Sequence, residues 1–325
     1  GSVKFGGSNL FSRLMLGLQL SIAIITVIAG IAFARNSEYQ RNYDFGYSME
    51  TTLGITFGDS ASYVPLKNEM AKIPEVSSLS GTRNHIAFSF RNVIAESEEM
   101  KKETDFLEVG RDYLKTMQLK LVAGRDFDPV SEADYDHALL ITEKLAAQFG
   151  WKGKEALGKR IYIDSANFSV VGILKDFHPD YLFNPMEPVA MKLAKESRFQ
   201  FLIMQAKPED LTMVYGKAQD AWKRLFPLKP FNGFYQNQVT AEAFETSKNI
   251  AIIFKWFAFV CMLLTATGLF ALVSLTTLKK TKEIALRKVV GAAPHHIMVL
   301  INKSYFWIFL GSAIVGCYGG YALTK

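Results

Sequence analysis

The chain has 325 residues, of which 49% are hydrophobic and 21% are charged, and its formal net charge is +6. This composition is rich in apolar residues for a soluble protein and too charged for a chain lying wholly in a membrane, so it indicates a few spans and a folded polar domain. The basic residues gather partly beside the apolar segments, which favours membrane topology over nucleic-acid binding. Cys261 and Cys317 lie inside apolar runs and predict neither a disulfide framework nor a metal site.

The first predicted element is a transmembrane helix over residues 14–34, preceded by a cytoplasmic segment over residues 1–13. As a helix the run would extend about 32 Å, enough to cross a bilayer. A cleaved signal peptide is the alternative, because Ala32, Phe33 and Ala34 imitate a cleavage site. The run is longer than the roughly 7–15 apolar residues of a signal peptide, which favours the span.

The polar stretch over residues 35–248 is predicted to be an extracytoplasmic domain. Strands are expected where β-branched and aromatic residues gather, at residues 51–57, 86–94, 159–163, 168–174 and 199–205. Helices are expected at residues 63–73, 142–149 and 211–226. Because strands and helices do not alternate strictly, the pattern favours an α+β domain over a doubly wound sheet.

Two further transmembrane helices are predicted at residues 249–278 and 297–325. The first of them carries Lys255 near its start, where a lysine can snorkel to the interface beside Trp256. The second carries small residues that allow helices to approach closely in lipid: Gly311, Ser312, Gly316, Gly319 and Gly320.

The flanking charges predict the orientation of these helices. Lys4 and Arg13 precede the first span without an acidic residue. The loop over residues 279–296 carries five basic residues against one acid, Glu283. The positive-inside rule therefore places the N-terminal segment and this loop in the cytoplasm, and the domain over residues 35–248 outside it.

One motif of the polar stretch imitates a phosphate-binding loop. GKEALGK, at residues 153–159, has the glycine and lysine spacing of such a loop. Arg160 stands where a serine or threonine would bind Mg²⁺, and the predicted order is helix, loop, strand. The motif therefore predicts a turn bounded by glycines.

A second motif, KDFHPD, imitates a metal site. On a strand, Asp176, His178 and Asp180 would share one face, but Pro179 interrupts a strand there. The motif therefore predicts a turn at a strand end. No catalytic, cofactor-binding or metal-binding residue is expected on this chain.

The most specific motif is TKEIALRKVVGAAPHHI, at residues 281–297. Glu283 precedes Arg287 by four residues, the favourable order for a helical ion pair. Gly291 can end this helix and Pro294 can lie in the first turn of the next. Apolar residues recur at helical spacing, at Leu286, Val289, Val290, Ala293 and Ile297. The pattern predicts a short amphipathic helix, and it leaves open whether anionic lipid or protein contacts that helix.

At this motif the chain resembles the FtsX-like, MacB-type permeases of ABC transporters, in particular their second-repeat half in double-length versions. Their loop after the second span typically reads R-T-K-E-I-x-I-R-K-V-x-G-A, and KTKEIALRKVVGAAPHHI stands here. Residues 109–127, 138–161 and 170–190 also resemble the large extracytoplasmic domain of this family. The resemblance thus covers nearly the whole chain.

The resemblance implies a membrane protein with transmembrane helices and a large α+β extracytoplasmic domain of two lobes, one inserted at about residues 104–192. It implies the bacterial inner membrane, several spans and a domain in the periplasm. Four spans per unit are implied, so a last span is expected beyond this chain, and Gly1 is expected to lie within a longer natural protein.

The resemblance also implies a non-catalytic subunit that transmits motion. A separate cytoplasmic ATPase would bind ATP and Mg, and its hydrolysis would move the extracytoplasmic domain for export or regulation. The short helix would be the coupling helix, with its contact made by Lys282, Glu283, Ile284, Arg287, Lys288 and Gly291. The other implied partners are a second permease unit, membrane lipid and a periplasmic adaptor, and no nucleic acid.

Two other functions fit the same topology. A ligand-sensing membrane receptor would also carry an outward α+β domain on flanking spans. A membrane-tethered scaffold would do so without an ATPase. The third span and the absence of a signalling module in the cytoplasmic segments disfavour the receptor.

Overall fold

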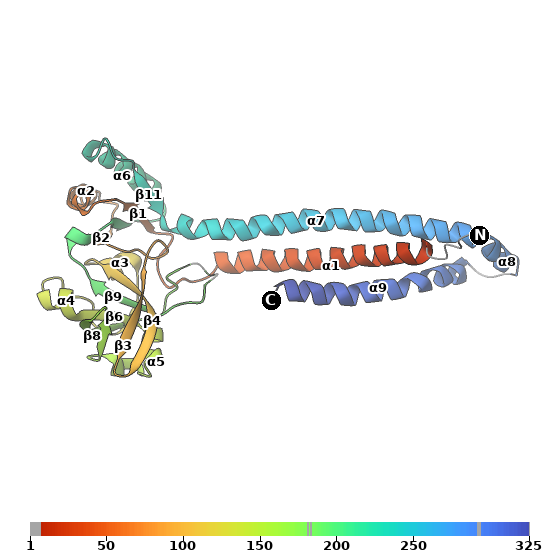
Figure 1. Ribbon diagram of the computed structural model, residues 1–325. Coiled ribbons are helices and arrows are strands. Elements are labelled where there is room, and N and C mark those ends of the chain that lie inside the picture. The colour runs from red at the N-terminus through yellow and green to blue at the C-terminus, as the bar shows by residue number, and fades with distance from the viewer. Residues whose placement is uncertain (1–7, 181, 183, 291–293, 325) are drawn as a thin grey trace, which may run out of the picture. The chain divides into compact units, whose positions relative to one another are not determined.

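The computed structural model describes residues 8–180, 182, 184–290 and 294–324, which form two compact units. One unit contains the long helices, and the other is the polar domain Tyr43–Ala243. The long helices are α1 (Ser8–Arg41), α7 (Gln236–Lys279) and α9 (Pro294–Thr324), and α8 (Thr281–Val289) lies between the last two. Figure 1 shows α1, α7 and α9 side by side.

Each long helix contains a segment that is long and apolar enough to cross a membrane. These segments are Ser12–Arg41, Lys248–Lys279 and Tyr305–Thr324. Helices α1 and α7 have 34 and 44 residues, well beyond the roughly 20 that a bilayer requires. They continue past the apolar runs because no proline interrupts the polar sequence beside them.

Helices α1 and α9 pack closely through glycines of α9. A Cβ added at Gly316 would lie 2.7 Å from the Cβ of Ile24, and one at Gly320 would lie 2.8 Å from the Cδ1 of Ile28. The prediction of a small-residue packing surface is confirmed at these positions and at Gly319. It is wrong at Gly311, which is exposed and has nothing within 4 Å of its Cβ position, because it lies on another side of α9.

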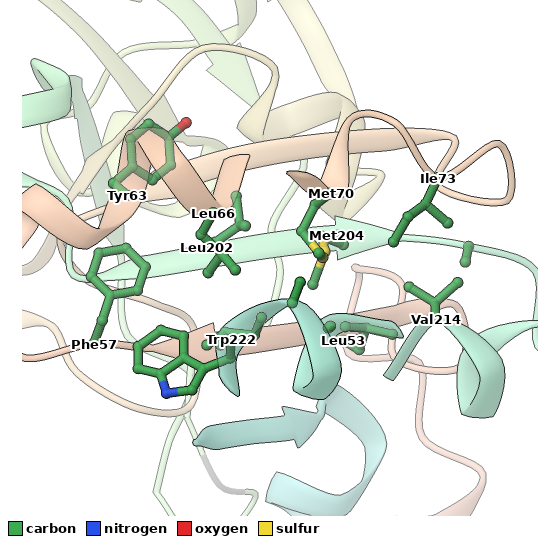
Figure 2. Close-up of a cluster of buried hydrophobic side chains, with 14 of the residues drawn as sticks. Leu53, Phe57, Tyr63, Leu66, Met70, Ile73, Leu202, Met204, Val214 and Trp222 are labelled. Carbon is green, nitrogen blue, oxygen red and sulfur yellow. The ribbon is translucent and has the colours of Figure 1, made fainter. Parts of the chain in front are cut away.

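The first lobe of the domain is an antiparallel sheet in the order β11-β1-β10-β2, with two helices packed on it. Its elements are β1 (Thr52–Thr56), α2 (Tyr63–Met70), β2 (Ser78–Thr82), β10 (Phe201–Gln205), α6 (Leu211–Leu225) and β11 (Asn232–Tyr235). Figure 2 shows the core between sheet and helices, where Trp222 of α6 lies near Leu53 of β1 and Phe57. The predicted helices at residues 63–73 and 211–226 are confirmed.

The second lobe is a closed ring of strands. Its elements are β3 (Arg91–Ser97), β4 (Met100–Val109), β6 (Ala138–Thr142), α5 (Glu143–Gln148), β7 (Arg160–Ile163), β8 (Ala166–Leu174) and β9 (Val189–Leu193). The strands follow the order β4-β3-β7-β8-β6-β9, and β9 pairs in parallel with β4. Edge strand β5 (Leu121–Gly124) pairs with β8, while α3 (Tyr113–Met117) and α4 (Glu132–His137) connect strands. The two lobes of an α+β domain are thereby shown.

Two sequence expectations need correction in this region. The sequence predicts that the inserted lobe begins at about Thr104, which lies inside β4. The lobe begins earlier, with β3, because β3 pairs along β4 and contributes Val93 and Ala95 to the same core. The strand expected at residues 86–94 begins only at Arg91. Before it, the chain reverses at Ala87, whose φ is +65°, and Phe88 N–H donates to the carbonyl of His85.

A buried hydrogen-bonded relay holds the first residue of α7. Nδ1 of His85 lies 2.9 Å from the hydroxyl of Tyr113, and its Nε2 lies 2.8 Å from Oε1 of Gln236. Both His85 and Gln236 are fully buried. Burial lowers the pKa of His85 to about 4, so the ring is neutral near pH 7. The amide oxygen of Gln236 only accepts, so Nε2 carries the proton and Nδ1 accepts from Tyr113.

An ion triad around one buried carboxylate joins the two lobes. The carboxylate of Glu108, at the end of β4, is 3% exposed and lies 2.7 Å from Arg83 and 3.0 Å from Arg198. Arg83 follows β2 of the first lobe, and its N–H donates to the carbonyl of Glu108. A buried carboxylate needs such partners because desolvation without them is costly. The triad therefore fastens the lobes where β2 pairs with β4.

Candidate functional site

The candidate site is α8, the short helix between the two membrane-type helices α7 and α9. It begins one residue after α7 ends, and the hydroxyl of Thr281 donates to the carbonyl of Thr277, 3.0 Å away. Ile284 N–H donates to the carbonyl of Lys280 at 2.9 Å. These bonds connect the start of α8 to the end of α7.

A tyrosine anchors the ends of α7 and α9 beside α8. Tyr305 of α9 is 3% exposed, and its hydroxyl lies 2.8 Å from Oγ1 of Thr276 and 3.2 Å from the carbonyl of Leu272. Arg13 of α1 lies over the same ring, 6.0 Å from its centroid. Sequence reasoning missed this anchor, although an aromatic residue at the end of an apolar run is a common interfacial signal.

The charged side of α8 agrees with the sequence prediction. Arg287 pairs with Glu283 at 2.8 Å, four residues earlier, and both side chains are about half exposed. Lys282 is exposed and Ile284 is partly buried. Lys288 belongs to the helix, although its side chain lies outside what the structure describes, as does Gly291 altogether.

The apolar side of α8 is open. Leu286 is 69% exposed, Val289 86% and Val290 87%. Three adjacent large apolar side chains with this exposure, beside basic residues, are typical of a surface that another molecule covers. The arrangement can therefore serve as a docking surface with an apolar centre and a charged border.

GKEALGK forms a turn, as predicted, whereas KDFHPD follows its strand as an irregular segment that ends in a bend at Asp180. Gly153 and Gly158 have φ angles of +51° and +78°, a conformation that favours glycine, and the 3-10 helix Gly153–Ala156 lies between α5 and β7. The lysines of this turn are exposed, and it lies in the order helix, turn, strand instead of opening a helix.

The polar residues of KDFHPD diverge after β8 ends. Asp176 accepts from the N–H of Lys144 in the first turn of α5 at 2.8 Å, where a carboxylate suits the helix dipole. Asp180 accepts from the amide of Asn184. His178 is buried, and its backbone N–H donates to the carbonyl of Phe45. Burial lowers the pKa of the His178 side chain. Within the described part of the chain, no group of three or more His, Cys, Asp or Glu side chains could hold a metal ion.

Two family descriptions match the chain over nearly its whole length. Residues 14–221 match the MacB-like periplasmic core domain, and residues 255–325 match the FtsX-like permease C-terminal region. The first match covers α1 and most of the polar domain. The second covers most of α7, α8 and α9.

Similar proteins are macrolide export ATP-binding/permease proteins MacB. The one from Haemophilus ducreyi is 22% identical over 64% of this chain and 31% of its own length. The one from Chromobacterium violaceum is 19% identical over 66% of this chain and 33% of its own length. This chain thus spans about a third of the length of these relatives.

A similar solved structure is the periplasmic region of MacB from Actinobacillus actinomycetemcomitans. It has a TM-score of 0.45 and 13% identity, and it covers 61% of this chain and 94% of that chain. The assignment rests on the family matches, which include both the polar domain and the helices that carry α8. The chain therefore belongs to the FtsX-like, MacB-like family of ABC permeases.

Proposed function

We propose that this chain is the permease subunit of an ABC transporter that transmits motion across the bacterial inner membrane. A separate cytoplasmic ATPase binds ATP and Mg, and this chain itself holds no cofactor. Hydrolysis moves the periplasmic domain, for export or for regulation outside the cytoplasm. A second permease unit completes the membrane part, and a periplasmic adaptor is a further partner in this proposal.

The observation that carries the proposal is the open apolar side of α8. Leu286 and Val289 of α8 and Val290, the residue after it, are exposed, and the same helix carries Lys282 and Arg287. A protein groove can cover the valines and pair the cations in one contact, as expected for a helix that docks on a partner subunit. Lys282, Glu283, Ile284, Arg287, Lys288 and Gly291 are the proposed contact residues.

A continuous helix provides the path for the motion. Helix α7 has 44 residues, which corresponds to about 66 Å at 1.5 Å a residue. Its last turn is bonded to α8, and its first residue, Gln236, is held by His85 in the domain. In this proposal, movement of α8 is passed along α7 toward the domain.

The test reverses charge on α8. The double variant Arg287→Glu, Lys288→Glu is compared with Lys154→Glu, Lys159→Glu, which makes the same charge change on exposed lysines of the domain. Co-purification with a co-expressed ABC ATP-binding subunit from the same organism and stimulated ATP hydrolysis are measured. The α8 variant is expected to lose both, at least tenfold, and the control to keep both. Unchanged binding and hydrolysis in the α8 variant would refute the assignment.

A further inference from the structure

A groove of about 700 Å³ lies between α1 and α7, near the ends of these helices that adjoin the polar sequence. Its wall is mostly apolar and its rim is charged. The apolar and small residues are Val27, Gly30, Ile31, Ala34, Ala251, Ile252, Phe254, Ala258 and Met262. The charged residues are Glu38, Arg41, Lys248 and Lys255.

An aromatic spacer flanked by alanines creates this groove. The ring of Phe254 stacks on Phe33 of α1, with centroids 5.6 Å apart and planes at 10°. A Cβ added at Gly30 would lie 3.3 Å from the Cβ of Phe254, so the glycine allows α7 to approach α1 closely beside the stacked rings. Ala34 and Ala251 are too small to fill the space beside the ring. The groove is thus built into the contact between these helices.

The groove has the length of one bilayer leaflet. Its lining runs from Thr26 to Arg41, about 22 Å along α1. Half of a bilayer measures about 20–22 Å when the head groups are included. Along this length the lining of α1 changes from apolar residues to charged residues. A bilayer leaflet changes in the same way from its acyl chains to its head groups. A single lipid molecule therefore matches the groove in both length and polarity.

The charge of the rim selects the kind of lipid. Lys255 is the charge inside the apolar run of α7, and it lies two helical turns from Lys248, so both line the groove. Lys248 pairs with Glu245 at 3.0 Å, whereas the structure records no ion pair for Lys255 or Arg41 within its described residues. A lysine within a membrane span is costly unless a partner offsets it, and such residues mark functional sites. The groove therefore carries three basic residues against one acid, Glu38, and its charge is net positive, which favours an anionic ligand.

We propose that this groove is a binding site for one anionic phospholipid of the outer leaflet. An acyl chain lies along Val27, Ile31 and Met262, and the phosphate group lies among Arg41, Lys248 and Lys255. A zwitterionic lipid would supply the same chain, but its cationic group would face the basic rim. The site does not depend on an ATPase or on α8.

The experiment counts lipids bound to the purified full chain in a neutral detergent by native mass spectrometry. Palmitoyl-oleoyl phosphatidylglycerol and the matching phosphatidylcholine are titrated separately. One phosphatidylglycerol is expected to remain bound with roughly tenfold preference over phosphatidylcholine. Equal retention of the two lipids would overturn the proposal.

Matched variants locate the site. Lys255→Gln and Arg41→Gln are expected to reduce phosphatidylglycerol retention to the level of phosphatidylcholine. Arg35→Gln, also on α1 but outside the groove, is expected to keep the preference. Retained preference in both groove variants would overturn the assignment.

A second pair of variants does not alter charge. Ala251→Phe fills the groove and is expected to abolish tight retention of both lipids, whereas Ala271→Phe, on an exposed part of α7 outside the groove, is expected to leave it intact. Retention of lipid by Ala251→Phe would overturn the proposal. A lipid-free dimer of wild-type chains, with the groove covered by the second copy, would overturn it as well.

Discussion

The relay at His85 gives a sharp test because its effect depends on pH in a known direction. His85→Phe keeps an aromatic ring among Phe88, Phe201 and Phe234, whose ring centroids lie 5.7–5.9 Å from that of His85. It removes the acceptor for Tyr113 and the donor for Gln236. Each buried polar group left unpaired costs about 1–3 kcal/mol, so the loss at pH 8 is expected to be about 3 kcal/mol.

Lowering the pH should reduce the difference in unfolding free energy between wild type and His85→Phe. The pKa of His85 is about 4 in the folded protein, because of burial, against about 6.5 in the unfolded chain. The unfolded state therefore binds the proton more readily, and the stabilisation is complete above about pH 6.5 and lost as the pH falls toward 4. At pH 5 the wild type is expected to have lost about 2 kcal/mol of its unfolding free energy. The wild type is then more stable than His85→Phe by about 1 kcal/mol.

Asp105 titrates in the same range with the opposite sign. Burial and the nearby Glu187 raise its pKa to about 6, so its folded state binds the proton more readily and gains stability as the pH falls. Both proteins contain Asp105, so its contribution cancels in the difference between wild type and His85→Phe. The effect of the relay is therefore measured by the difference in unfolding free energy between the two proteins at each pH. The pH dependence of either protein alone also contains the contribution of Asp105.

Hydrogen exchange of the full chain in detergent measures this difference locally. The amides of Phe88 and Ser89 donate to the carbonyl of His85, so their opening free energies report the loop. Tyr113→Phe is the control, because it removes one hydrogen bond of the relay but keeps the buried imidazole of His85. This variant should therefore retain the pH dependence of the opening free energy. A difference between wild type and His85→Phe that is the same at pH 8 and pH 5 would refute the neutral buried relay.

Three further predictions concern packing and charge. Gly320→Leu should lower the thermal stability of the detergent-solubilised chain, because its side chain would meet Ile28, whereas Gly311→Leu should not; equal effects would contradict the α1–α9 contact. Arg83→Leu should reduce the unfolding free energy measured by chemical denaturation by about 2 kcal/mol, because its partner Glu108 is buried. Lys101→Leu, at an exposed ion pair with Glu96, should reduce it by under about 1 kcal/mol. The reverse order would contradict the triad. Trp222→Ala should cost about 3–5 kcal/mol in the same assay, against nearly nothing for Leu228→Ala, which is 97% exposed; a small effect at Trp222 would contradict the core of the first lobe.

The helices and the candidate site were largely predictable because their signals are local. Apolar runs mark the three membrane-type helices, and the spacing of Glu283 and Arg287 predicts an ion pair that the structure contains. The glycines at 153 and 158 predict a turn through their own backbone freedom. In each case the information lies within a few residues of chain.

The domain was harder to predict because strands depend on distant partners. The run at residues 86–94 is rich in strand-forming residues, yet its first part follows His85 into a buried reversal that Tyr113 and Gln236 stabilise. Strand β4 carries five charged residues among its ten and shows no regular alternation with apolar residues. It becomes a member of the ring by pairing with β3 and β9. Strand propensity reflects such surroundings more than the backbone itself.

The order of residues alone predicts which segments are apolar enough for a membrane, where the basic helix lies between them, and that an α+β domain separates the first span from the second. These properties follow from composition and short-range periodicity. The packing of the helices shows that Gly316 lies against α1 while Gly311 does not, and that Lys255 lines a groove together with Arg41 of another helix. Such choices depend on the rotation and separation of whole helices, which side chains distant in sequence determine together.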